Sequence, residues 1–152
     1  MPTVGEAAPD FKLQSTEDRE ISLGEYKGKK NVVIAFYPLD FSPVCSVQIP
    51  DYNEHLKEFD AADTVILGIS RDSVYAHKAW REELGGIEIP LLADMKGEVA
   101  EKYGVYLPQM GISGRAVFVV DKEGVLRQAH IEQKLQEKRS AEEVLEMVRS
   151  LG

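Results

Sequence analysis

Short apolar runs alternate with amphipathic stretches along this chain. Continuous apolar runs of strand length, typical of strands buried on both faces of a sheet, occupy residues 31–38 (NVVIAFYP) and 64–70 (TVILGIS). PLLAD at 90–94 predicts a third short strand, and 116–132 predicts two strands joined by a KEG turn. Near the start, FKLQST and REISL predict a hairpin-like pair of strands around a polar turn.

Helical spacing of apolar side chains fills the intervals between these runs. The predicted helices cover 43–60, 73–84, 97–104 and 141–150. Gly104 ends the third of them, and Ser140 followed by Glu143 is a capping-box signature for the last.

This order of strands and helices predicts an α/β fold of three layers. A mixed central sheet is flanked by helices and preceded by an extra N-terminal hairpin, and the order matches a thioredoxin-like core. No internal repeat, low-complexity tract or linker interrupts the sequence, so we expect one domain over residues 1–152.

The composition excludes several classes of partner. Of the 152 residues 43% are hydrophobic and 29% charged, as in ordinary globular domains, and the net charge of −8 disfavours nucleic acid or an anionic membrane. No secretory signal or membrane span is visible. One cysteine excludes an internal disulfide, and the histidines at 55, 77 and 130 lack metal-ligand spacing. We therefore expect no metal, and a reducing cytoplasmic setting for the free thiol.

Cys45 admits two interpretations. Free cysteines are often buried and inert, which favours a core residue. Its neighbours favour a functional site instead, because Ser42 is a good N-cap and Pro43 fits the first helical position. Cys45 then lies in the first turn of a helix, directly after a buried strand. The unpaired N–H groups and the helix dipole there lower the pKa of a thiol, so we expect Cys45 to be presented to solvent as a thiolate.

The residues around Cys45 also carry a resemblance. Pro38, Ser42 and Cys45 match the Pro-x-x-x-Thr/Ser-x-x-Cys motif of peroxiredoxins, and Gln48 fits the Glu or Gln found three residues later. The likeness extends over nearly the whole chain through APDF, VVIAFYPLDFSPVC, ILGIS, PLLAD and GRAVFVVDKEGVLR. The family's arginine on a later strand falls on Arg115.

The resemblance implies a thiol peroxidase that reduces hydrogen peroxide, alkyl hydroperoxides or peroxynitrite through a Cys45 sulfenic acid. It implies that the Ser42 hydroxyl and the Cys45 N–H hold the peroxide, that Arg115 donates to sulfur and oxygen, and that Pro38 shields the thiolate. Gln48 would orient Arg115 or the peroxide network. A homodimer is also implied, and no metal, haem or flavin is.

Thiolate formation alone gives little acceleration. Lowering a thiol pKa from ~8.5 to ~6 raises the thiolate fraction at pH 7 about thirtyfold, but the accompanying loss of nucleophilicity removes about tenfold. The remaining gain is about two- to threefold, so most of the acceleration must come from binding the peroxide oxygens as their bond stretches.

The chain departs from many relatives in having no second, resolving cysteine. Where one group of relatives carries it, five residues after the first, this sequence has Pro50, which also predicts a kink in the helix. Recycling must then use an external thiol, either a low-molecular-weight thiol or a thioredoxin- or glutaredoxin-like protein. The pattern looks most like the one-Cys alkyl hydroperoxide reductase E type.

The sequence is also compatible with other interpretations. A monothiol carrier in thiol–disulfide exchange, and a non-enzymatic redox sensor or chaperone-like protein, could use the same thiol. Arg115 could be a solvated residue at a strand edge. The simplest interpretations make Asp40 a solvated charge and Tyr37 and Trp80 core aromatics, and they give His77 no catalytic role.

Overall fold

A five-stranded mixed sheet forms the centre of the computed structural model, which describes residues 2–134 and 137–151. The strand order is β5-β4-β3-β8-β9. Strands β3 (Asn31–Phe36), β4 (Thr64–Ser70) and β5 (Leu91–Ala93) are parallel, whereas β8 (Ala116–Val120) and β9 (Leu126–Ile131) continue the sheet in antiparallel fashion.

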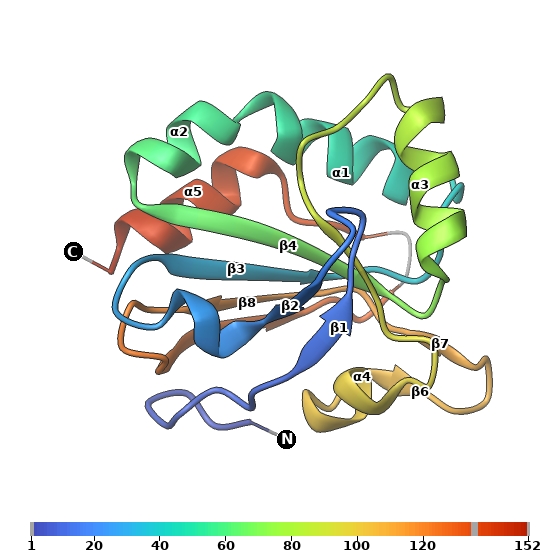
Figure 1. Ribbon diagram of the computed structural model, residues 1–152. Helices are drawn as coiled ribbons and strands as arrows, with labels where there is room; N and C mark the ends of the chain where they lie inside the picture. Colours follow the sequence, from blue (N-terminus) through green and yellow to red (C-terminus); the bar gives the residue numbers. More distant parts are fainter. Residues whose placement is uncertain (1, 135–136, 152) are drawn as a thin grey trace.

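The remaining elements cover the two faces of this sheet (Figure 1). The helices are α1 (Cys45–Glu54), α2 (Leu56–Ala61), α3 (Val74–Glu83), α4 (Glu98–Lys102) and α5 (Ala141–Arg149), with a 3-10 turn at Leu23–Tyr26. The short strands are β1 (Lys12–Gln14) paired with β2 (Glu20–Ser22), and β6 (Tyr106–Leu107) paired with β7 (Ile112–Ser113).

Alternating side chains of β3 divide the core into two clusters, as the period of two in a strand requires. Val33 and Ala35 pack with α1, α2, α3 and α5 on one face. Ile34 and Phe36 pack on the other face with α4 and the N-terminal hairpin. Both faces are buried, which explains why the sequence of this strand reads as an unbroken apolar run. The predicted three-layer thioredoxin-like fold is confirmed.

The prediction of one helix over 43–60 is wrong, because His55 separates α1 from α2. The His55 ring nitrogen Nδ1 lies 2.9 Å from the Asp51 carbonyl oxygen, the group that a continuing helix would bond to the His55 N–H. That N–H instead donates to the Tyr52 carbonyl at 3.1 Å. Pro50 lies inside α1, and the interruption comes at His55 rather than at the proline.

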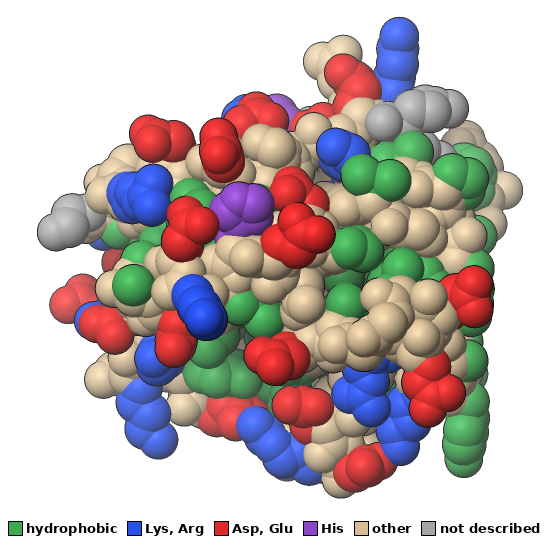
Figure 2. Space-filling model, turned by 90° about the horizontal axis from the view of Figure 1, so that it is seen from above, with side chains coloured by type: hydrophobic (Ala, Val, Ile, Leu, Met, Phe, Trp, Pro, Cys, Tyr) green, Lys and Arg blue, Asp and Glu red, His purple; other side chains and the backbone are tan. Residues whose placement is uncertain are grey.

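Charge is distributed rather than concentrated on the face formed by the helices above the sheet. Figure 2 shows acidic side chains there with lysines and arginines between them. None of the helices in the described part of the chain is long and apolar enough to cross a membrane.

Candidate active site

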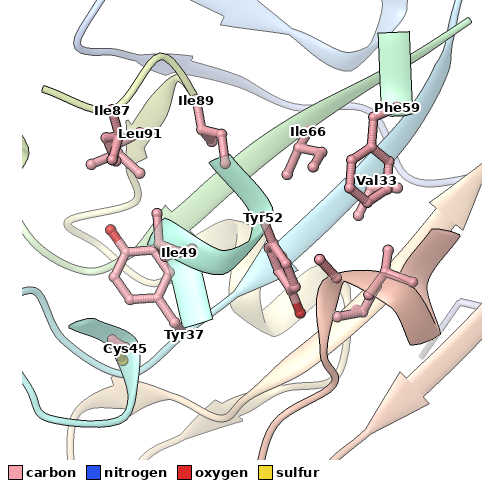
Figure 3. Close-up of a cluster of buried hydrophobic side chains, with 14 of the residues drawn as sticks. Val33, Tyr37, Cys45, Ile49, Tyr52, Phe59, Ile66, Ile87, Ile89 and Leu91 are labelled. Carbon is pink, nitrogen blue, oxygen red and sulfur yellow. The ribbon is translucent and has the colours of Figure 1, made fainter. Parts of the chain in front are cut away.

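Cys45 is the first residue of α1, at the end of the loop that leaves the carboxyl end of β3. Its side chain is 0% exposed and belongs to the apolar cluster that contains Tyr37 and Ile49 (Figure 3). The expectation that the helix start presents Cys45 to solvent is therefore wrong for this conformation. In the loop before it, Phe41 is exposed and has a backbone in the left-handed region, at φ 67°.

Ser42 does not cap α1 through its side chain, contrary to the prediction. Its hydroxyl donates a hydrogen bond to the Leu39 carbonyl at 2.9 Å, and its own carbonyl accepts from the Ser46 N–H at 2.9 Å. Because the hydroxyl hydrogen is used in this way, the lone pairs of its oxygen are the groups it can offer to a peroxide O–H. Pro38, at the other end of the same loop, is buried.

Arg115 immediately precedes β8 and is buried, with 2% of its surface exposed. Its Nη2 donates to the Cys45 sulfur at 3.2 Å, and its Nη1 donates to the Gln48 amide oxygen. The interpretation of Arg115 as a solvated strand-edge residue is wrong. The guanidinium is fixed between the thiol and Gln48, and it contacts both through hydrogen bonds.

Gln48 is itself held from its other side. Its Nε2 donates to the Tyr52 hydroxyl at 3.0 Å, and that hydroxyl donates to the Arg139 carbonyl at 2.7 Å. Both side chains project from α1 and are buried. The sequence singled out Gln48 but not Tyr52, although the spacing of four residues on one helix places them on the same face.

Asp40 is buried, so the prediction that it is a solvated charge is wrong. One of its carboxylate oxygens accepts from the Tyr37 hydroxyl at 2.6 Å, and the other lies 2.7 Å from the His77 Nδ1. The other His77 nitrogen, Nε2, lies 2.9 Å from the Leu92 carbonyl. His77 lies on the same helix face as Trp80, and a buried histidine requires partners. That spacing was the available signal for a buried His77, but it did not identify Asp40.

Asp72 extends this network from the end of β4. Its Oδ2 accepts from the Asp40 N–H at 2.9 Å and from the Ser70 hydroxyl at 2.6 Å. Among the described residues, Asp40, Asp72 and His77 are the one group whose potential metal-ligand atoms lie within 4.8 Å of one another. These atoms already hydrogen-bond within the protein, so the cluster is a structural network that ties the 38–42 loop to the sheet.

The arrangement around Cys45 suits a nucleophile that attacks a small polar molecule. A guanidinium contacts the sulfur, and the Cys45 N–H has no acceptor among residues 2–134 and 137–151, so it is available to a ligand. The Ser42 hydroxyl lies in the same loop. Thiol, cationic donor and backbone donor are the parts required to bind two linked oxygens next to a sulfur.

Comparisons with known proteins agree with this chemistry. The AhpC/TSA family profile matches residues 4–129. The chain is 38% identical over 160 residues to the chloroplastic 2-Cys peroxiredoxin BAS1 of Hordeum vulgare, covering 99% of this chain and 76% of the relative. It is 40% identical over 156 residues to peroxiredoxin-2 of Pongo abelii, covering 97% and 87%. It spans about half, 53%, of the BAS1 protein of Spinacia oleracea.

Solved structures give the same result. The reduced 2-Cys peroxiredoxin of Plasmodium vivax superimposes with a TM-score of 0.91 at 32% sequence identity, covering 99% of this chain and 82% of that one.

Proposed function

The chain belongs to the AhpC/TSA family and is a peroxiredoxin, a thiol-dependent peroxidase, and from that membership we propose that Cys45 is its peroxidatic residue, recycled by an external thiol. The observation that carries the proposal is the Arg115 Nη2 to Cys45 Sγ hydrogen bond of 3.2 Å. An arginine buried against the only cysteine has a clear use if that sulfur reacts as an anion.

In the proposed reaction the Cys45 thiolate attacks the nearer peroxide oxygen. The S–O bond forms as the O–O bond breaks. The leaving oxygen takes up a proton to become water or an alcohol, or departs as nitrite when the substrate is peroxynitrite. The sulfur is oxidised to a sulfenic acid. Arg115 and the Cys45 N–H stabilise the negative charge that develops on sulfur and oxygen, and the Ser42 oxygen accepts the peroxide O–H.

The remaining site residues have supporting roles. Pro38 shields the sulfur from water, and Gln48 holds the Arg115 guanidinium through its amide oxygen. Because the Cys45 side chain is buried, a local movement must open a path before a peroxide reaches the sulfur.

Recycling by an external thiol rests on the cysteine count. Several of the relatives are named 2-Cys peroxiredoxins, whereas these 152 residues contain Cys45 as their one cysteine, and Pro50 stands five residues after it. A first thiol attacks the sulfenic acid, giving a mixed disulfide and water, and a second releases the Cys45 thiol and a disulfide product. Low-molecular-weight thiols and thioredoxin- or glutaredoxin-like proteins are the candidate reductants. We also propose that the protein is a homodimer and that it is cytoplasmic. The free thiol supports the cytoplasmic location.

Stopped-flow measurement of Cys45 oxidation tests this proposal. We expect hydrogen peroxide, an alkyl hydroperoxide or peroxynitrite to oxidise Cys45 far faster than free cysteine, with Cys45→Ser inactive and folded. Adding glutathione, and in a separate arm thioredoxin with its reductase, is expected to restore turnover in at least one arm. Oxidation no faster than that of free cysteine contradicts the peroxidase. Fast oxidation without turnover in either arm contradicts the proposed recycling.

A further inference from the structure

Tyr52 is linked to the reactive sulfur by a continuous chain of buried hydrogen bonds. The Arg115 guanidinium contacts both Cys45 and Gln48, and Gln48 contacts the Tyr52 hydroxyl. Tyr52 is 0% exposed, and its ring lies in the core between α1 and α5, with its hydroxyl pointing away from Phe59 and Ile66 (Figure 3). The chain ends at the Arg139 carbonyl, which precedes α5.

The direction of every bond in this chain follows from the chemistry of its two ends. A guanidinium has donors only, so the Gln48 atom that faces Arg115 must be the amide oxygen. The amide nitrogen then faces Tyr52 and needs an acceptor. A carbonyl can only accept, so the Tyr52 hydrogen points to Arg139 and the phenol oxygen is left to accept from Gln48.

Tyr52 is able to keep this orientation across neutral pH. Burial raises the pKa of the Tyr52 phenol above its ordinary value, so the hydroxyl retains the hydrogen that it donates to Arg139.

We propose that Tyr52 is a positioning residue that fixes the amide of Gln48 with its oxygen toward Arg115, and thereby sets the Arg115 guanidinium against Cys45. The need for such a residue arises because the two ends of a glutamine amide differ. With the amide reversed, an NH2 group would face the guanidinium, donor against donor. A carboxylate at the same position would have two equivalent oxygens and would need no orienting partner. This inference rests on the proposed function, since it concerns the residues that serve Cys45.

The test is a double-mutant cycle read by the rate constant of Cys45 oxidation with hydrogen peroxide. Tyr52→Phe keeps the ring and removes the hydroxyl. We expect it to lower the rate constant about five- to tenfold, the equivalent of one neutral hydrogen bond. The same substitution is then made in a Gln48→Glu background and compared with Gln48→Glu alone. There we expect Tyr52→Phe to lower the rate constant less than about twofold, because the carboxylate needs no orientation.

Tyr103→Phe is the matched control. Tyr103 is also fully buried and donates its hydroxyl to a backbone carbonyl, that of Pro9, at 2.6 Å, but it lies in the core on the opposite face of the sheet. Its phenylalanine variant is expected to keep the native rate constant. An unchanged rate constant in Tyr52→Phe overturns the proposal. So does an equal loss in the two Gln48 backgrounds, since that is the result of a merely structural role.

A second readout does not depend on peroxidase activity. Nuclear magnetic resonance of the native protein is expected to show one Gln48 side-chain amide hydrogen protected from exchange with solvent, and Tyr52→Phe to abolish that protection. One outcome is that peroxide oxidises Cys45 no faster than free cysteine although the native protein shows this protection and Tyr52→Phe abolishes it. In that case the proposed function fails and the orienting role of Tyr52 stands. Absence of the protection in the native protein overturns that role.

Discussion

Arg115 donates a hydrogen bond to the sulfur of Cys45 although 70 positions separate them in the sequence. The register of the sheet brings them together. Ala116, the first residue of β8, pairs with Phe36, the last residue of β3, so Arg115 lies beside the point where the chain leaves β3 for the active-site loop. The contact is therefore a product of β3–β8 pairing.

Arg115→Lys is expected to slow the oxidation of Cys45 by peroxide about tenfold to a hundredfold. Lysine keeps the positive charge but cannot donate to the sulfur and to Gln48 at once from a planar group. A loss of this magnitude corresponds to the free energy of one hydrogen bond to a charged group. Stopped-flow fluorescence or competition kinetics measures the rate constant, with Arg127→Lys, at an exposed side chain of β9, as the control. Equal rate constants for the two variants would show that the guanidinium does not serve the reaction.

Local features of this fold could be predicted from the sequence. The apolar runs of β3 and β4 are unbroken because both faces of these strands are buried. The capping box at Ser140 and Glu143 was identified correctly because its two hydrogen bonds join residues three apart. The position of Cys45 at a strand-to-helix junction follows from the same local signals.

Contacts made across the fold could not be predicted. Asp40 lies in a loop that follows a strand, which is typical of a solvated charge, and its partner His77 lies 37 positions away on α3. The Tyr52 bond to Arg139 spans 87 positions. Hydrophobic periodicity determines which face of an element is buried, but not which polar group of another element meets it there. That depends on how the elements pack.

Gly68→Ala is expected to destabilise the protein by about 1–3 kcal/mol through overpacking beneath the site. Gly68 lies in β4, and an added Cβ would come within 2.9 Å of Leu91 Cδ2 and 3.4 Å of the Tyr37 ring. Urea-induced unfolding measures the change. Gly24→Ala is the control, because its added Cβ would meet the Asp10 carboxylate at an ordinary 3.4 Å. If Gly68→Ala loses no more stability than Gly24→Ala, the strand is not tightly packed there.

The stability of α5 is expected to depend on pH through Glu143. The hydrogen bond from the Ser140 N–H to its carboxylate lowers the pKa of Glu143 below the ordinary 4.5. A lowered pKa means that the folded state favours the ionised form. This stabilisation is therefore present above about pH 4.5 and is lost as pH falls through the folded-state pKa.

Glu143→Gln should accordingly cost less than about 1 kcal/mol near neutral pH, a small effect because the carboxylate is exposed and screened by solvent. The difference from the native protein should vanish in acid. Unfolding free energies measured from neutral pH down to about pH 3 test this. Glu142→Gln, in the same turn but outside the capping pair, is the control. A Glu143→Gln deficit that stays constant through the acid range would contradict the assigned cause.

Two substitutions of Asp40 are expected to differ sharply in their cost to stability, because Asp40 is paired with the buried His77. Asp40→Ala removes the carboxylate that accepts from the Tyr37 hydroxyl and contacts His77 Nδ1, and leaves these two buried groups to pair with each other across 3.3 Å, which should cost about 1–3 kcal/mol. Asp40→Asn should cost much less. Its oxygen can still accept from Tyr37, and its NH2 can donate to His77 Nδ1 while His77 Nε2 donates to the Leu92 carbonyl.

The same two variants should differ in peroxide reactivity, because Asp40 also anchors the loop that contains Pro38 and Ser42 through its N–H bond to Asp72. We expect Asp40→Ala to lower the rate constant of Cys45 oxidation and Asp40→Asn to keep most of it. Denaturant unfolding and stopped-flow kinetics on each variant measure the two effects. Asp60→Ala, at an exposed side chain, supplies the control for loss of a surface carboxylate. If alanine and asparagine at position 40 are equally harmful, the charge itself, and not the hydrogen-bond pattern, holds the loop.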